Sequence, residues 1–278
     1  MAQLASFYVA GIDLASSSAE GALSRFETVC GTERRMSAKR GKLWVGTSGY
    51  HYDHWKDVFY PRNLPKRRWF TYYASHFDTV EINNTFYHLP QAQSFDVWRE
   101  QAPPNFCYAL KFSRYGSHLK RLQEPHASIA KFLDRASRLQ ECLGPILVQL
   151  PPHWTPDPAR LAGFLKAAPS AYRWAIEFRD PRWLCDEVYA ILRSSAAALC
   201  LHDLIADHPR YLTADWTYLR FHGVSYGGSY TRQALTAHAT QINQYLADGL
   251  DVFAYFNNDA HGHAVQNAAD LRRYLRGD

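Results

Sequence analysis

Ionisable and hydrogen-bonding side chains stand at the ends of short apolar segments throughout this sequence. Glu81 and Asn83 end one segment, and Glu177 and Arg179 end another. In a strand, residues i and i+2 point to the same face, so each pair would act at one site. Carboxylates and imidazoles exchange protons, and guanidinium groups bind anions through paired hydrogen bonds. The residues in such positions are Ser48, Glu81, Asn83, Lys111, Gln149, Glu177, Arg179, Asp203, Arg220, His222, Asn257 and Asn258.

An anion-binding enzyme is the interpretation of this set that we favour. Arg179 and Arg220 would clamp a phosphate or carboxylate. Glu81 or Glu177 would be the general base, with its pKa set by burial against those cations. His222 would donate a proton or orient the ligand. We expect a small polar ligand, anionic or sugar-like, and the acid–base chemistry of an isomerase, lyase or hydrolase.

Three other interpretations use the same residues. Glu81, Glu177, Asp203 and His222 could hold a divalent metal, but the neighbouring cations would repel it, so a metal is not favoured and the cofactor stays undetermined. Lys111 could form a Schiff base with a carbonyl substrate, although a lysine at a strand end is not specific to that reaction. Finally, the three cations could simply neutralise the three carboxylates as a structural network.

Aromatic residues gather after the same apolar segments and make up 15% of the chain. Flat rings beside polar groups suit a sugar face or a nucleobase. A nucleic-acid-binding or nuclease-like protein is therefore one alternative function, and a non-catalytic ligand sensor is another. Rings that only pack loops onto the body are the simpler explanation for many of them. Those expected to touch the ligand are Tyr50, Trp55, Tyr87 and Tyr230, the last in a glycine-containing segment, YGGSY, that could close as a lid.

The elements that must position these residues are short strands alternating with amphipathic stretches. The apolar runs are rich in β-branched and aromatic residues and are bounded by Gly, Pro or Asp, as in strands buried on both faces. They begin at Leu43, Thr79, Phe106, Pro145, Arg173, Ala197, Thr217 and Asp251. Eight strands with intervening helices over about 237 residues predict an α/β fold, a single TIM-type (βα)8 barrel.

In such a barrel, chemistry takes place at the carboxyl ends of the strands, where the polar residues fall. A doubly wound open sheet is the alternative, but it needs a glycine-rich nucleotide-binding turn, and GTSG at residues 46–49 is too short for one. The interval between the sixth and seventh runs has no room for a full helix. We therefore expect the sixth helix to be short or missing.

Composition argues against several other classes of protein. The 278 residues carry a net charge of +5, a surplus too small to indicate nucleic acid by itself. No apolar run is long enough to span a membrane, and no basic residue precedes the first apolar stretch as in a secretory signal. The five cysteines are odd in number, far apart and without a CxxC motif, which is typical of reduced thiols. We expect a cytoplasmic protein without a membrane partner.

Residues 1–41 differ from the rest of the chain. They contain Ser, Ala, Gly and scattered charge without a clear period, and they lead into the basic segment RRMSAKRGK. We expect a poorly ordered N-terminal extension ahead of a barrel of residues 42–278. An upstream start, with Met36 as the true first residue, is one explanation of the extension. An arm that docks on the barrel is the alternative.

Several motifs together resemble the YecE-like family, also called domain of unknown function 72. They are GTSGYHYDHW from Gly46, FYP from Phe59, VEINNTFYHLP from Val80, LVQLPP from Leu147, AIEFRDPRW from Ala175, YLRFHG from Tyr218, and FNND followed by QNA at Gln266. They occur in the family's order from Leu43 to the C-terminus. The resemblance implies a TIM-type barrel, and it strengthens the location of the site without supplying a reaction.

The motif residues of the family fall largely on the residues already singled out here. Where the family's first motif usually has Trp, this chain has Tyr50, which keeps an aromatic ring but alters the pocket. The matching positions are Gly46, Ser48, Gly49, Trp55, Glu81, Asn83, Phe86, Tyr87, Gln149, Glu177, Arg179, Arg220, His222, Gly223, Asn257 and Asn258.

Overall fold

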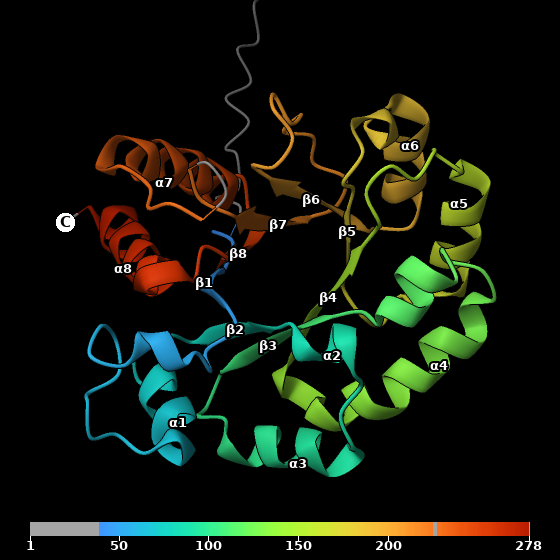
Figure 1. Cartoon of the computed structure of the whole chain (residues 1–278). Coiled ribbons are helices and arrows are strands. Elements are labelled where there is room, and N and C mark those ends of the chain that lie inside the picture. Colours follow the sequence, from blue (N-terminus) through green and yellow to red (C-terminus); the bar gives the residue numbers. More distant parts are fainter. Residues whose placement is uncertain (1–38, 225–226, 278) are drawn as a thin grey trace, which may run out of the picture. The chain divides into compact units, whose positions relative to one another are not determined.

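Parallel strands close into an eight-stranded barrel in the computed structural model, which describes residues 39–224 and 227–277 (Figure 1). Each strand pairs with the next along the chain, and the last pairs with the first, as expected for a TIM-type barrel. The strands are β1 Leu43–Ser48, β2 Thr79–Ile82, β3 Cys107–Lys111, β4 Leu143–Gln149, β5 Trp174–Glu177, β6 Ala198–His202, β7 Trp216–Phe221 and β8 Asp251–Phe256.

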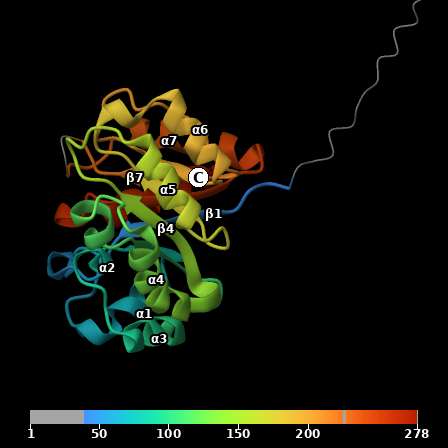
Figure 2. The ribbon, with the colours of Figure 1, turned by 90° about the vertical axis from the view of Figure 1, so that its right-hand side faces the viewer.

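Helices surround the barrel and bury their apolar faces against the outer sides of the strands. Helices α4, α5 and α6 cover the side that Figure 2 turns toward the viewer. The expected barrel is confirmed. The helices are α1 Trp69–Ala74, α2 Asn84–Tyr87, α3 Ala92–Gln101, α4 Pro125–Ala136, α5 Pro158–Ala167, α6 Asp186–Ser194, α7 Arg232–Ala247 and α8 His263–Arg276.

The connection from β6 to β7, residues 203–215, carries no helix. This confirms the expectation that the sixth helix of the barrel, the one after the sixth strand, is short or missing; the helix labelled α6 lies before β6. One buried side chain in this connection ties it to the barrel instead. The Thr213 hydroxyl donates to the carbonyl of Ala197 (2.7 Å) and accepts from the amide of Leu199 (2.8 Å). Two hydrogen bonds from one side chain thus hold the connection against β6.

The barrel interior is filled by a cluster of its own, separate from the core between strands and helices. Small residues on several strands leave room for two large rings, Tyr218 on β7 and Tyr255 on β8, whose centroids lie 5.2 Å apart. Alternation along each strand then brings the next inward-facing residue toward the carboxyl-end mouth. The interior residues are Ala109, Leu147, Ala175, Ala198, Cys200, Trp216, Tyr218, Phe253 and Tyr255.

Strands β1 and β2 pair over only two positions, and a side chain from α1 bridges them at the amino-terminal edge of that pairing. The fully buried Tyr73 hydroxyl accepts from the Thr47 amide (3.0 Å) and donates to the Thr79 carbonyl (3.0 Å). Gly46 permits this approach, because a Cβ there would lie 2.3 Å from the Thr79 carbonyl oxygen and 3.0 Å from the Tyr73 hydroxyl. We call this arrangement the β1–β2 seam.

The predicted N-terminal extension lies outside the described residues up to position 38. Of its last residues, Arg40 donates to Asn243 Oδ1 (2.6 Å), and the Gly41 amide donates to the Leu246 carbonyl (2.9 Å), so both contact α7. No helix in the described ranges is long and apolar enough to cross a membrane.

Candidate functional site

The floor of the barrel mouth is an arginine held between two glutamates. Arg220 on β7 donates from Nη2 to Glu81 Oε1 and from Nη1 to Glu177 Oε2, each at 2.7 Å. Arg220 is 1% exposed and both glutamates are fully buried. The guanidinium thus links β2 to β5 across the barrel, as the predicted structural network would. We call these three residues the Glu–Arg–Glu bridge.

The remaining carboxylate oxygens of the bridge also have partners. The Tyr218 hydroxyl donates to Glu81 Oε2 at 2.7 Å, and Arg179 Nε donates to Glu177 Oε1. Arg179 Nη2 continues the chain of contacts to Gln149 Oε1 at 3.2 Å. All four oxygens of the two glutamates are therefore engaged by side-chain donors.

Electrostatics keep both carboxylates ionised. Burial is the largest single influence and by itself would raise the pKa of Glu81 and Glu177, but the guanidinium of Arg220 and the other neighbouring cations and donors together outweigh it. Lys111 and the Ser48 hydroxyl lower the pKa of Glu81 further, and Arg179 lowers that of Glu177. The resulting pKa lies below the ordinary value for Glu81 and well below it for Glu177, so both are weak bases.

Lys111 differs from the other cations of the mouth. It ends β3 with 7% of its surface exposed, and its Nζ lies 4.5 Å from the centroid of the Phe86 ring. In the part of the chain that the structure describes, its ammonium makes no hydrogen bond or ion pair. Burial and then the charge of Arg220 lower the pKa of Lys111 from 10.5 to about 8. This lysine is a desolvated amine that faces an aromatic ring and forms no ion pair among the described residues.

A second polar group lies at the ends of β6 and β7. Asp203 Oδ1 lies 2.9 Å from His222 Nδ1 and accepts from the backbone amide of His222 (2.9 Å). The Tyr230 hydroxyl donates to Asp203 Oδ2 and accepts from the Gly223 amide (2.8 Å). Burial lowers the pKa of His222 although Asp203 opposes it, so the ring is neutral at neutral pH.

His202 takes a structural position beside this group. Its Nε2 lies 2.7 Å from the Phe178 carbonyl oxygen, and its Nδ1 accepts from the Leu204 amide at 3.2 Å. Burial lowers the pKa of His202 to about 4. A neutral ring with both nitrogens bonded to backbone positions the loop after β6 rather than a ligand.

The other predicted site residues are divided between the mouth and the packing around it. Asn83 and Asn257 are partly exposed next to the mouth, and Asn83 Oδ1 is a buried acceptor without a partner among the described residues. Asn258 is buried, and its Nδ2 donates to the Gly228 carbonyl (2.9 Å) and to Asn267 Oδ1 (3.0 Å). Asn258 therefore positions the segment before Tyr230.

Aromatic clusters are present at the rim, and most of their rings pack against one another. Trp55 is fully buried and donates from its indole to the Asp259 carbonyl (2.9 Å), and Tyr50 packs on Phe70 and Tyr73. Tyr87, in contrast, is 76% exposed. The lid expected at YGGSY spans residues 226–230, and position 226 lies outside the described residues.

Two residues of the site escaped the sequence analysis. Tyr218 stands two positions before Arg220 on β7, so its alternation could have placed it in the barrel, but its type suggested core. His118 lies on a π-helical turn, Tyr115–Leu119, with its ring 4.9 Å from Phe86. Nothing in the sequence predicted that turn, although π-helical turns are frequent at functional sites.

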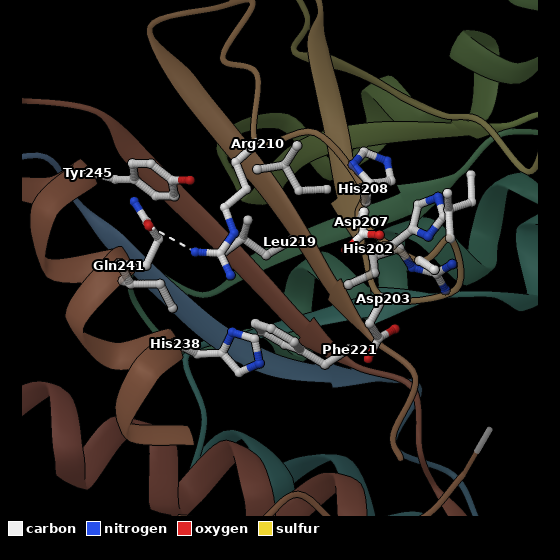
Figure 3. Close-up of a pocket in the computed structure, with 15 residues that line it drawn as sticks. His202, Asp203, Asp207, His208, Arg210, Leu219, Phe221, His238, Gln241 and Tyr245 are labelled. Carbon is white, nitrogen blue, oxygen red and sulfur yellow. Dashed lines mark hydrogen bonds between the residues drawn. The ribbon is translucent and has the colours of Figure 1, made fainter. Parts of the chain in front are cut away.

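A cavity of about 620 Å³ opens beside β6 and β7, where the sixth helix is missing (Figure 3). Apolar side chains of β6, β7 and α7 form its floor, and Arg210 bonds to Gln241 Oε1 (3.0 Å) at its edge. Figure 3 shows His238 beside the Phe221 ring, with Asp203 at the edge nearer the mouth. The described residues include no cluster of three or more His, Cys, Asp or Glu side chains suited to a metal.

Comparison with known proteins places the chain in a family. The family model described as "Protein of unknown function DUF72" matches residues 44–278, which include all of the barrel strands except Leu43, the first residue of β1. The chain belongs to this family. The resemblance noted from the motifs is thereby confirmed, and the Glu–Arg–Glu bridge is a feature of a DUF72 barrel.

Relatives of this DUF72 protein include curated proteins and a solved structure. YecE of Escherichia coli K12 is 34% identical over 112 residues, which are 40% of this chain and 41% of YecE, so the match spans about two-fifths of that relative. YunF of Bacillus subtilis is 24% identical over 270 residues, 84% of this chain and 94% of YunF. A crystal structure of a DUF72 family protein from Thermotoga maritima has a TM-score of 0.78 at 26% identity, covering 84% of this chain and 99% of that one.

Proposed function

We propose that this DUF72 protein is an enzyme that binds a small, polar, anionic ligand at the carboxyl-end mouth and performs acid–base chemistry on it. The observation that carries the proposal is Lys111, a nearly buried cation at a strand end whose ammonium has no hydrogen-bond or ion-pair partner among the described residues. Burying an unpaired charge destabilises a fold, so a ligand that neutralises it is the simplest reason for its presence.

The roles of the cations follow from their partners. Arg220 has both terminal nitrogens engaged by buried carboxylates, so it supports the floor and is a poor anion clamp. Arg179 is 16% exposed, and among the described residues its hydrogen bonds use Nε and Nη2, which leaves Nη1 for a ligand. Lys111 and Arg179 therefore take the place of the predicted arginine pair as ligand-binding cations.

Proton transfer is better suited to His222 than to the glutamates. The low pKa of Glu81 and Glu177 makes them weak bases, whereas a neutral imidazole held by Asp203 resembles the base–carboxylate pairs of many enzymes. Arg220 Nη1 lies 3.4 Å from His222 Nε2, so the bridge also orients the ring. Most rings of the rim pack against one another and are not available to stack on bases. They therefore do not favour the alternative of a nucleic-acid-binding protein.

Ligand binding can be measured as the shift in melting temperature caused by four probes: glyoxylate, D-gluconate, 3-phosphoglycerate and inorganic phosphate. At least one probe should raise the melting temperature of the wild type in a saturable way. The shift should disappear in Lys111→Met and weaken in Arg179→Gln, and it should persist in Lys166→Met, which removes an exposed lysine of α5. Equal shifts in Lys111→Met and wild type would refute a site at the mouth.

An enzyme and a ligand sensor differ in whether the bound ligand exchanges protons. A probe that binds and carries a C–H next to its carboxylate, as D-gluconate and 3-phosphoglycerate do, should be incubated with the protein in D2O and followed by NMR for loss of that C–H signal. We expect exchange by the wild type and at least about tenfold slower exchange by His222→Asn with binding retained. Binding without exchange of any ligand proton would support the sensor.

A further inference from the structure

We infer that Lys111 forms a covalent imine with a small aldehyde or ketone that carries an anionic group. The inference rests on the ligand site proposed above and names its substrate class. It stands on the position of the amine: at the end of β3, at the mouth of the barrel, with its stem buried and its nitrogen over the Phe86 ring.

The amine is close to the carboxylates of the floor and yet has no share in their contacts. Glu81 is engaged by Arg220 and Tyr218, and Glu177 by Arg220 and Arg179, so the two glutamates are satisfied without it. A lysine whose role was to neutralise them would form an ion pair with one of them. Among the described residues Lys111 forms no ion pair with either glutamate, so its nitrogen is not committed to them.

The surroundings also favour the reactive, uncharged form of the amine. With its pKa at about 8, about a tenth of Lys111 is deprotonated at pH 7, against about 3 in 10,000 for a lysine at 10.5. Burial and the neighbouring guanidinium of Arg220 are the causes. Desolvation beside another cation is a known means of activating a lysine for attack on carbonyls.

The step balances within the site and water. The Lys111 nitrogen attacks the carbonyl carbon, a C–N bond forms, and the C=O electrons move to the oxygen. The carbinolamine then loses that oxygen as water together with two of the three ammonium protons, which leaves a protonated imine. No oxidant, reductant or cofactor is required, because an ammonium and a carbonyl yield an iminium and one water.

The anionic group is assigned from the neighbouring cations. Arg179 is partly exposed and bonds to Glu177 and Gln149 at the ends of β5 and β4, and its charge is among those that lower the pKa of Lys111. Burial, and after it the charges of Lys111 and Arg114, lower the pKa of His118 to about 4. A substrate with a carboxylate next to its carbonyl, as in a 2-oxo acid, would place negative charge among these cations.

Reductive trapping tests the inference. The full-length protein is incubated with glyoxylate or pyruvate and sodium cyanoborohydride, and adducts are located by peptide mass spectrometry. We expect one dominant adduct at Lys111, formed at least about tenfold faster than at the exposed Lys131 and Lys166, with a rate that rises around pH 8. Butanal, which has no charge, should label Lys111 more slowly than glyoxylate does.

Two variants separate the inference from the proposed site. Lys111→Arg keeps the charge without a nucleophilic amine, so it should lose the adduct and retain a melting shift with glyoxylate. Lys166→Arg should match the wild type in both. A melting shift that needs Lys111 without any adduct at it overturns the imine and leaves the anion site standing. Adducts spread equally over exposed lysines, with no melting shift, overturn both.

Discussion

Arg220 and Lys111 are both cations buried at the mouth of the barrel, and their surroundings assign them opposite roles. Arg220 donates to two carboxylates, while the Lys111 ammonium faces an aromatic ring. Removing one partner of a buried ion pair leaves an uncompensated charge, whereas removing an unpaired charge relieves a desolvation penalty. The same substitution at the two positions should therefore have opposite effects on stability.

We expect Arg220→Met to lower the free energy of unfolding by about 3–5 kcal/mol, because Glu81 and Glu177 would stay buried without a cation. Lys111→Met should leave stability unchanged or raise it. Chemical denaturation followed by circular dichroism measures both. A loss of more than about 1 kcal/mol in Lys111→Met would identify Lys111 as a structural member of the network.

Stability should also depend on pH through Lys111. Its pKa is about 8 in the folded protein against 10.5 ordinarily, so below pH 8 both states carry the charge and the folded state bears its desolvation. Between pH 8 and 10.5 the folded state alone releases the proton, which removes a cost of about 3 kcal/mol. The free energy of unfolding of wild type relative to Lys111→Met should rise across this window. A flat difference would contradict the lowered pKa.

Sequence alternation was sufficient to place the polar residues at the mouth but not to pair them. Glu81 and Glu177 were expected as candidate bases and Arg220 as an anion clamp. Glu81 and Arg220 lie 139 residues apart, and only closure of the barrel brings them within 2.7 Å. A strand pattern shows which face a side chain occupies, and it carries no information about which charge stands opposite.

The connection between β6 and β7 shows how one element can be replaced by side-chain contacts. The connection is thirteen residues long, 203–215. The sequence alone therefore predicted that no full helix lies there, because two turns and a helix do not fit into that length. The hydrogen bonds of Thr213 to Ala197 and Leu199 could not be foreseen, since a threonine in a polar loop looks like any surface residue.

Thr213→Val should therefore destabilise the protein by about 2–4 kcal/mol, because it leaves the Leu199 amide of β6 and the Ala197 carbonyl just before β6 buried without their partner. Thr213→Ser keeps the hydroxyl and should remain within about 1 kcal/mol of the wild type. Denaturant unfolding of the two variants gives the comparison. Equal stability of the Val and Ser variants would show that the hydroxyl does not hold the connection.

At the scale of the whole barrel, closure depends on the β1–β2 seam. The Tyr73 hydroxyl connects Thr47 to Thr79 at the amino-terminal edge of the short pairing between β1 and β2. The barrel itself was predictable from eight apolar runs at barrel spacing. The seam was not, because Tyr73 belongs to a helix whose aromatic residues read only as packing.

Tyr73→Phe should lower the free energy of unfolding by about 2–4 kcal/mol and speed amide exchange at Thr47, because both seam groups would lose a buried partner. Tyr72→Phe is the matched control on the same helix, since within the described ranges the Tyr72 hydroxyl makes no hydrogen bond. Unchanged Thr47 exchange in Tyr73→Phe would mean that the backbone closes the barrel unaided.

Because residues 203–215 contain no helix, the chain could be circularly permuted there, with its strands and helices encoded in a different linear order. Arg40 and Arg276, near the two ends of the described barrel, line one small cavity, so a short linker could join those ends. New ends placed at Asp207, in the exposed connection, would interrupt neither a helix nor a strand. A circularly permuted gene beginning there keeps every strand pairing, and its product would carry the mouth residues in a different linear order around the same floor.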